Sequence, residues 1–163
     1  MTVIGLDPGT EKSAIVVVVD GMPEQPMTVL NDALLTFLEC WPVDAHTTLV
    51  IEEVVGMGMA VGREVFQTVF WSGRFAQAWR GKWDRVSRRD VKLHLCGTMK
   101  AKDQNIRQAL IDHFGPGKEK AIGSKAFKGP LYGVKGHEYA ALAVALTWLD
   151  RQNGEVSRAW ASR

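Results

Sequence analysis

The first thirty residues contain three apolar runs separated by two tight turns, and this pattern limits the folds open to the chain. Thr2 to Leu6 and Ala14 to Val19 are rich in β-branched residues, which favour strands, and a third strand is expected near Met27 to Leu30. Asp7-Pro8-Gly9-Thr10 has Pro and Gly where β-turns favour them, and Asp20-Gly21 is typical of a hairpin. We therefore expect the chain to begin with three antiparallel strands.

The rest of the chain alternates between helix and strand signals. The helical spacing of Leu34, Leu35 and Leu38 predicts a helix that Asn31 caps and that ends before Pro42. Further elements are expected, in chain order, as a strand at Thr48 to Val55, a helix over residues 60 to 80, a strand at Trp83 to Ser87, a helix at Lys102 to Phe114 and a helix at His137 to Leu149. Residues 115 to 136 are dense in Gly and Lys without apolar periodicity, so they are interpreted as a mobile basic loop. The order of elements predicts an α/β fold.

Length and composition are those of one globular domain spanning residues 1 to 163. Of the 163 residues, 46% are hydrophobic and 23% are charged, which allows a core that needs no disulfides. The two cysteines, Cys40 and Cys96, lie far apart and form no CxxC pair, so neither a disulfide framework nor a zinc knuckle is expected. The apolar run from Ala14 to Val19 is too short to cross a membrane. We expect a protein of the reducing cytoplasm, in a bacterium or a phage-infected host, with no membrane partner.

The net charge of +2 hides an uneven distribution. Residues 80 to 135 hold 14 of the 20 Lys and Arg but only 5 of the 18 Asp and Glu, so this window carries +9 and the remainder −7. Such asymmetry suggests a surface that faces a polyanion, and nucleic acid is the leading candidate. A solvated, lysine-rich surface with no partner is the alternative.

Two acidic residues interrupt apolar runs. Asp7 follows the first expected strand, and Glu52 lies in the middle of a later strand beside Glu53. Because side chains alternate along a strand, Glu52 and Glu53 face opposite ways, and a carboxylate that faces the interior needs a metal ion or another partner. Two plainer explanations remain open: Asp7 can simply open a turn, and Glu52 can pair with an arginine at a strand edge.

Three segments together resemble the RuvC-type Holliday junction resolvases of the RNase H-like superfamily, especially their phage-encoded relatives. These segments read IGLDPGT at the start, VIEEV in the later strand and GHEYAALAVAL in the final helix. The resemblance spans nearly the whole chain and implies a mixed five-stranded sheet, with three antiparallel strands and then two parallel strands, flanked by helices. By position, it implies that Asp7, Glu52 and His137 are catalytic residues and ligands of two Mg²⁺ or Mn²⁺ ions, which serve to cut DNA at a four-way junction.

One position departs from the resolvase pattern. The family's last aspartate would fall three residues after His137, where this chain has Ala140. Residues i and i+3 share a helix face, so an acid here would point with His137 towards Asp7, whereas alanine offers no ligand. Glu138 lies about 160° away around the helix, and we do not expect it to replace the missing acid. The resemblance thus implies a structure-selective endonuclease that is inactivated at Ala140 in this chain, by design or by natural loss.

The resemblance also points to residues that contact DNA. It places Lys92 and Lys102 where the family keeps lysines near the scissile phosphate, and it implies a catalytic role for Lys102. The remaining DNA-binding candidates are basic residues of the positive window, namely Arg88, Arg89, Lys100, Lys125, Lys128 and Lys135. The family's base-stacking position just after the strand-four Glu is the aliphatic Val55 here, which argues against stacking at that point.

A homodimer is expected, and two competing functions are considered. A Holliday junction has pseudo-two-fold symmetry, which two identical sites in a C2 dimer match, and the apolar helix over residues 60 to 80 can supply the interface. Actin-like ATPases and sugar kinases share a GLDPGT-like segment, but they need a second, duplicated domain, for which 163 residues leave no room. A branched-DNA-binding protein without catalysis is the alternative that the gap at Ala140 supports.

Overall fold

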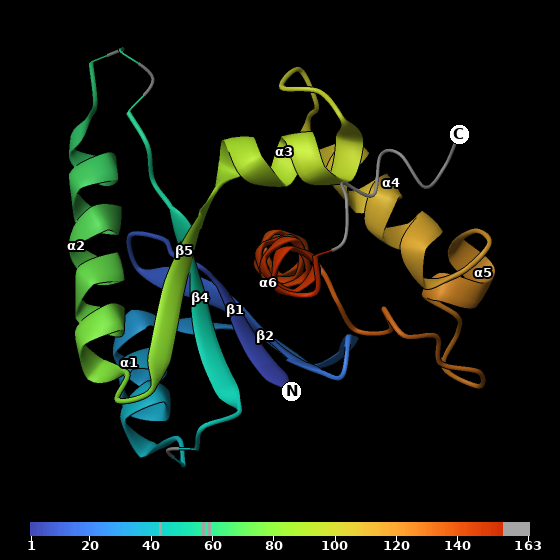
Figure 1. The fold of residues 1–163 in the computed structure, drawn as a ribbon, viewed down its shortest axis with the longest axis horizontal. Coiled ribbons are helices and arrows are strands. Elements are labelled where there is room, and N and C mark those ends of the chain that lie inside the picture. The colour runs from blue at the N-terminus through green and yellow to red at the C-terminus, as the bar shows by residue number, and fades with distance from the viewer. Residues whose placement is uncertain (43, 57, 59, 155–163) are drawn as a thin grey trace.

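A mixed five-stranded sheet organises the part of the chain that the computed structural model describes, residues 1–42, 44–56, 58 and 60–154 (Figure 1). The strands lie in the order β3-β2-β1-β4-β5. Their bounds are β1 Thr2–Asp7, β2 Lys12–Val19, β3 Met22–Leu30, β4 Thr47–Glu53 and β5 Lys82–Ser87. β1, β2 and β3 pair antiparallel, while β4 runs parallel to β1 and β5 parallel to β4. This confirms the expected mixed sheet of three antiparallel strands and then two parallel strands.

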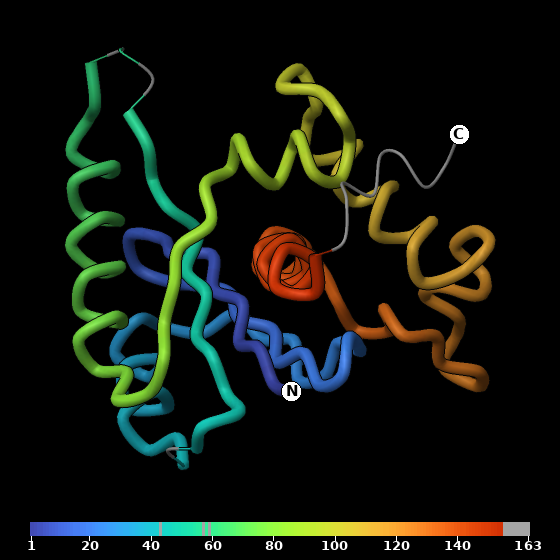
Figure 2. The backbone as a smooth tube through the Cα atoms, in the orientation of Figure 1, coloured from blue at the N-terminus to red at the C-terminus, as the bar shows by residue number. Residues whose placement is uncertain are grey.

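Helices cover both faces of the sheet. One face carries α1 and α2, and the other carries α6, which Figure 1 shows almost end-on beside the strands. Figure 2 shows the chain after β5 running in an arc around α6, through α3, α4 and α5. The helix bounds are α1 Asn31–Cys40, α2 Arg63–Ala78, α3 Arg88–Cys96, α4 Asp103–Phe114, α5 Lys118–Ala121 and α6 Glu138–Gln152. No helix within the described residues is long and apolar enough to span a membrane.

Alternating residues of the central strands fill two cores, one on each face of the sheet. Ile4 and Leu6 of β1 pack on the side of α1 and α2, together with Phe75 of α2. Val3 of β1 packs on the opposite side, against α6. Eleven of the fifteen residues of α6 are buried, which explains why the final helix is apolar around most of its circumference.

Gly5 in β1 allows α6 to lie directly against the centre of the sheet. A Cβ atom at Gly5 would lie 2.0 Å from the backbone oxygen of Ala141 and 2.9 Å from the Cβ of Ala145. Any side chain at residue 5 would therefore push α6 away from β1. This close approach sets the position of the first turn of α6 relative to the end of β1, where Asp7 lies.

Two helices were not expected from the sequence. α3 follows β5 directly, and its ends carry recognisable signals: the Ser87 hydroxyl accepts a hydrogen bond from the Asp90 amide at 3.2 Å, and Gly97 ends the helix with a left-handed φ of 69°. α5 lies inside residues 115 to 136, which the sequence suggested to be a loop. That segment also contains a bridge between Gly123 and Lys128, and its Leu131 is fully buried.

Candidate active site

The strand register brings two acidic residues together at one edge of the sheet. β1 and β4 run parallel, and Leu6 pairs with Ile51, so Asp7 and Glu52 are the next residues on the two neighbouring strands. Both side chains line a cleft of about 780 Å³ between the sheet, α3, α4 and the start of α6. His137 and Ala140 line the same cleft, so the structure brings together all four positions that the resolvase pattern indicated.

The turn after Asp7 is held by other side chains, which leaves the Asp7 carboxylate for the cleft. The Gly9 amide donates a hydrogen bond to Ser13 Oγ at 3.1 Å, and Ser13 Oγ donates in turn to Asn31 Oδ1 at 2.7 Å. Asn31 Nδ2 closes the ring by donating to the Gly9 oxygen at 3.0 Å. The expectation that Asn31 caps α1 is therefore wrong. The N-cap position is Leu30, with no side-chain cap, because the buried amide of Asn31 is used to tie the turn to α1.

His137 stands at the N-cap position of α6 and contacts Asp7. Its Nδ1 atom lies 2.9 Å from Asp7 Oδ2, while 81% of its side chain remains exposed and that of Asp7 is only 15% exposed. The imidazole thus reaches the buried carboxylate from the solvent side of the cleft. This arrangement leaves one face of the Asp7–His137 pair open to a bound molecule.

Glu52 has one satisfied and one unsatisfied oxygen. Its Oε1 accepts a hydrogen bond from Arg88 Nη1 at 3.0 Å, whereas Oε2 is buried and has no hydrogen-bond partner among the residues that the structure describes. Glu53 faces the other way, where its Oε1 lies 2.9 Å from Arg85 Nη1. Both explanations offered for Glu52 hold in part, because this residue pairs with an arginine and also presents an uncompensated oxygen to its surroundings.

Burial, together with the nearby Glu52 carboxylate, changes the protonation of Asp7. Burial, and then the charge of Glu52, raise the pKa of Asp7 to about 7, although its contact with His137 opposes the rise. A buried acid beside a second acid is stabilised either by a proton or by a cation. The unsatisfied Oε2 atom of Glu52 and the raised pKa of Asp7 both indicate a place that favours positive charge.

Ala140 lies one turn along α6 from His137 and contributes only a methyl group to the cleft. Glu138 does not fill the gap: its side chain is 1% exposed, Oε1 accepts from Thr28 Oγ1 at 3.1 Å, and Oε2 accepts from the Lys135 amide at 2.9 Å. The carboxylate of Glu138 is therefore used to hold β3 and the chain before α6. Its direction agrees with the helical geometry, which places it on a different face from Ala140.

The residues present fit one divalent cation better than two. Asp7 and Glu52 offer carboxylate oxygens, the donors that Mg²⁺ and Mn²⁺ prefer, and an unsatisfied oxygen among them. However, no cluster of three or more His, Cys, Asp or Glu within the described residues is arranged to hold a metal ion. A second cation would have to rely on His137 and on residue 140, which is alanine. The donor set thus lacks the anionic ligand that a second hard cation requires.

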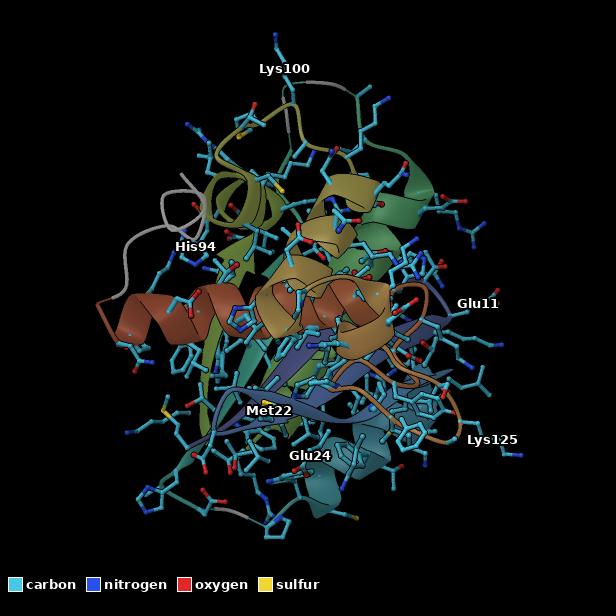
Figure 3. The ribbon with its side chains drawn as sticks, turned by 90° about the vertical axis from the view of Figure 1, so that its right-hand side faces the viewer. Glu11, Met22, Glu24, His94, Lys100 and Lys125 are labelled. Atoms are coloured by element: carbon cyan, nitrogen blue, oxygen red, sulfur yellow. The ribbon has the colours of Figure 1, made fainter. Side chains whose placement is uncertain are left out.

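The expected DNA-binding residues are divided between the cleft and the outer surface. Arg88 and Lys135 line the cleft. The other candidates lie outside the lining among the described residues: Arg89, Lys92, Lys100, Lys102, Lys125 and Lys128. Figure 3 shows Lys100 and Lys125 at widely separated points of the surface, so these two lysines do not belong to one compact patch.

Four residues with polar side chains that line the cleft were not singled out from the sequence. Asp103, Gln104 and Arg107 come from α4, and Tyr139 comes from α6. Arg88 contacts both Asp103 and Glu52, and the Arg107 guanidinium lies 5.0 Å from the centre of the Tyr139 ring. The spacing of Asp103 and Arg107 places them on one helix face, which was the available signal. This spacing does not show which neighbouring helix or strand that face of α4 packs against.

Asp7→Asn should stabilise the metal-free protein at pH 8. The folded-state pKa of Asp7, about 7, lies above its ordinary value of 3.8, so the stability of the native chain falls as pH rises from about 4 to 7. Asparagine removes this penalty, and we expect a gain of about 2 kcal/mol above pH 7, less than the full shift implies because the contact with His137 weakens. The gain should shrink below pH 7 and vanish near pH 4. Urea unfolding in EDTA across this range measures it.

Asp112→Asn is the matched control, because Asp112 is an exposed carboxylate of α4 that accepts a hydrogen bond from Gln108 at 2.8 Å, a bond that asparagine can keep. At pH 8 this substitution should change the free energy of unfolding far less than Asp7→Asn does. If Asp7→Asn is less stable than the native chain at pH 8, the ionised Asp7 carboxylate does not destabilise the folded protein at that pH.

Comparisons with solved structures show that nearly the whole chain resembles a known fold. The structure of RuvC from Thermus thermophilus superposes with a TM-score of 0.61 and 17% sequence identity, over 96% of this chain and 99% of that chain. A structure of T. thermophilus RuvC in complex with Holliday junction substrate gives a TM-score of 0.61 and 16% identity, over 96% and 98% of the two chains. No protein-family model and no curated protein matches the sequence.

At these identities the similarity concerns the fold. It extends over nearly the whole chain and includes the sheet whose edge carries Asp7 and Glu52. The resemblance drawn from the IGLDPGT, VIEEV and GHEYAALAVAL segments is therefore confirmed for the fold. This chain has the RuvC fold.

Proposed function

We propose that this chain is a RuvC-type protein that binds four-way DNA junctions, with a nuclease site that is incomplete at Ala140. The observation that carries the proposal is the convergence of Asp7 and Glu52 at the end of two parallel strands, with Ala140 one turn along α6 from His137. The complex of T. thermophilus RuvC with a Holliday junction substrate supports branched DNA as the ligand. The test compares junction cleavage by this chain and by its Ala140→Asp variant.

The charged residues in and near the cleft have distinct roles in this proposal. Asp7 and Glu52 would hold one Mg²⁺ or Mn²⁺ ion, which would supply Lewis-acid stabilisation of the charge that develops on the scissile phosphate. Lys135 and Arg107 bind phosphate oxygens at the cleft wall, where their positive charge faces the DNA backbone. His137 orients Asp7 through the 2.9 Å contact. Lys102 and Lys92, close to the cleft in sequence but outside its lining, extend the positive surface along the DNA.

A non-catalytic junction-binding protein is the second candidate. The observation in its favour is Arg88, whose guanidinium contacts both Glu52 and Asp103 and so supplies positive charge inside the cleft without a metal ion. The positive charge of Arg88 beside Glu52 reduces the repulsion between the acidic site and a phosphate group. The two candidates share DNA binding and differ in whether an acid at residue 140 restores cleavage.

We further propose that the chain forms a two-fold symmetric homodimer through α2. The buried residue of α2 is Phe75, whereas Phe66 and Phe70 are 65% and 63% exposed and Val69 is 48% exposed. An exposed cluster of this kind is typical of an interface, and a dimer with two identical sites matches the pseudo-two-fold symmetry of a four-way junction.

Replacing both exposed phenylalanines of α2 should separate the dimer. We expect the double variant Phe66→Glu, Phe70→Glu to raise the dimer dissociation constant at least ~100-fold, because each buried aromatic anchor contributes about 2 kcal/mol or more. Sedimentation velocity at micromolar concentration measures the change. Gln152→Glu adds a charge to an exposed position of α6, on the opposite face of the sheet from α2, and should leave the dimer intact. A native chain that sediments only as a monomer would contradict the proposal.

A further inference from the structure

The segment before α6 forms a small basic hairpin, residues 122–129, with a defined backbone. Gly123 and Lys128 form a bridge, and the Ser124 amide donates to the Phe127 oxygen at 2.9 Å. The Phe127 amide donates to Ser124 Oγ at 3.3 Å, and the Gly129 amide donates to the Ile122 oxygen at 2.9 Å. These bonds fix the direction in which the tip of the hairpin points.

The base of the hairpin is anchored in the protein. Ala121 and Leu131, on either side of it, are fully buried, and the Leu131 amide donates to the Ala121 oxygen at 2.8 Å. Gly129 packs so closely that a Cβ atom there would lie 2.3 Å from the Lys120 oxygen. The hairpin is therefore a projection from a fixed base, and its tip extends into solvent.

The tip carries the most exposed large apolar side chain among the described residues, Phe127, which is 84% exposed. Lys125 and Lys128 flank it, and the Lys128 ammonium lies 5.1 Å from the centre of the Tyr132 ring, a side chain that is 37% exposed. Residues 115 to 136 contain five lysines and a single acid, Glu119. Aromatic rings interleaved with lysines are the combination that binds unstacked nucleobases, because the ring stacks on a base while the lysines neutralise the adjacent phosphates.

The hairpin lies within reach of DNA in the cleft. Lys135, which lines the cleft, follows Phe127 by eight residues. Even a fully extended chain of this length spans at most about 29 Å, or about eight or nine base steps of one DNA strand. Figure 3 shows Lys125 and Glu11 towards the end of the molecule at which α6 begins, whereas His94 lies towards the other end of α6.

We propose that Phe127 stacks on an unstacked nucleobase at the branch point of DNA whose phosphates lie in the cleft, with Lys125 and Lys128 holding the backbone on either side. The inference rests on the proposed junction binding and adds the residue that distinguishes a branch point from linear duplex. A four-way junction exposes bases at its centre that a duplex keeps stacked. Phe127 therefore contributes to junction affinity and not to duplex affinity.

The test uses a four-way junction with 2-aminopurine at its centre, together with a linear duplex of the same sequence. Phe127→Ala should weaken junction binding about tenfold and abolish the change in 2-aminopurine fluorescence, while duplex binding stays within about twofold. Phe127→Trp should retain both junction affinity and the fluorescence change. Met22→Ala, which also removes an exposed apolar side chain (47% exposed), is the control and should behave as the native chain. Thermal melts establish that each variant is folded.

The outcomes separate this inference from the proposed function. If Phe127→Ala keeps the junction preference and the fluorescence change, the stacking role is overturned while junction binding stands. If the native chain itself shows no preference for the junction, both proposals fall. Binding of the native chain, but not of Phe127→Ala, to vesicles of phosphatidylserine and phosphatidylcholine, with DNA binding unaffected by the substitution, would overturn stacking in favour of a membrane surface.

Discussion

Ala140→Asp is expected to produce symmetrical nicking of four-way junctions in Mg²⁺ or Mn²⁺, whereas the chain with Ala140 cuts them slowly or not at all. Residue 140 lines the cleft with Asp7 and Glu52, and it lies one helical turn from His137. An aspartate there adds the anionic ligand that a second hard cation requires. We expect a rate increase of at least ~100-fold, because a correctly placed cation stabilises the transition state by several kcal/mol.

The measurement is cleavage of a labelled four-way junction at matched protein and metal concentrations. Ala140→Asn is the matched control, because it adds a side chain of the same size without the charge and should restore little activity. In the Ala140→Asp background, Asp7→Asn or Glu52→Gln should abolish nicking. Junction binding should persist in the native chain, because the basic residues are unchanged and the absence of one acid reduces repulsion of phosphate.

Equal cleavage rates for the native chain and Ala140→Asp would show that residue 140 does not belong to the metal site. Glu138 is then a poor substitute, because its carboxylate is buried and bonded to Thr28 and the Lys135 amide. Asp103 becomes the first candidate, since it lines the cleft and contacts Arg88, which also contacts Glu52. Asp103→Asn should then abolish the activity.

The strands could be predicted from local sequence because their signals are local. The β-branched run from Ala14 to Val19 and the turn at residues 7 to 10 determine an antiparallel start without reference to the rest of the chain. The parallel pairing of β4 and β5 with this meander depends on crossovers, and it was expected through the family resemblance. The placement of Asp7 beside Glu52 follows from that pairing.

α3 was missed because apolar periodicity was the criterion for a helix. Its sequence, RRDVKLHLC, is strongly polar, and three of its nine residues are buried: Val91, His94 and Leu95. The capping signals at Ser87, Asp90 and Gly97 were present and would have predicted both ends of the helix. Start and stop signals are therefore more informative than hydrophobicity for a short helix at the edge of a core.

The partners of polar residues in and near the cleft could not be predicted because these contacts join segments distant in sequence. Arg88, which the sequence offered as a DNA-binding candidate, also pairs with Glu52, 36 residues earlier, and contacts Asp103, 15 residues later. Asn31 was expected to cap a helix, yet it binds Gly9 and Ser13. In each case the residue type indicated a polar role, and only the three-dimensional arrangement identified the partner.

Junction binding by this chain should be strongly dependent on salt and should exceed binding to linear duplex. The window from residue 80 to 135 carries +9, and the structure places some of its basic residues in the cleft and others on the hairpin. If 6–10 of them neutralise phosphates, the affinity should fall by about 10³–10⁵ between roughly 50 and 200 mM salt, because each contact releases counterions. Gel-shift titrations at several salt concentrations give the slope of log affinity against log salt concentration.

The double variant Lys125→Ala, Lys128→Ala should reduce the magnitude of this slope by about 2, whereas Arg63→Ala, outside the window, should leave it unchanged. Equal affinity for junction and duplex across this range would show that the positive surface recognises only backbone charge, and the assignment of the junction as ligand would then be wrong.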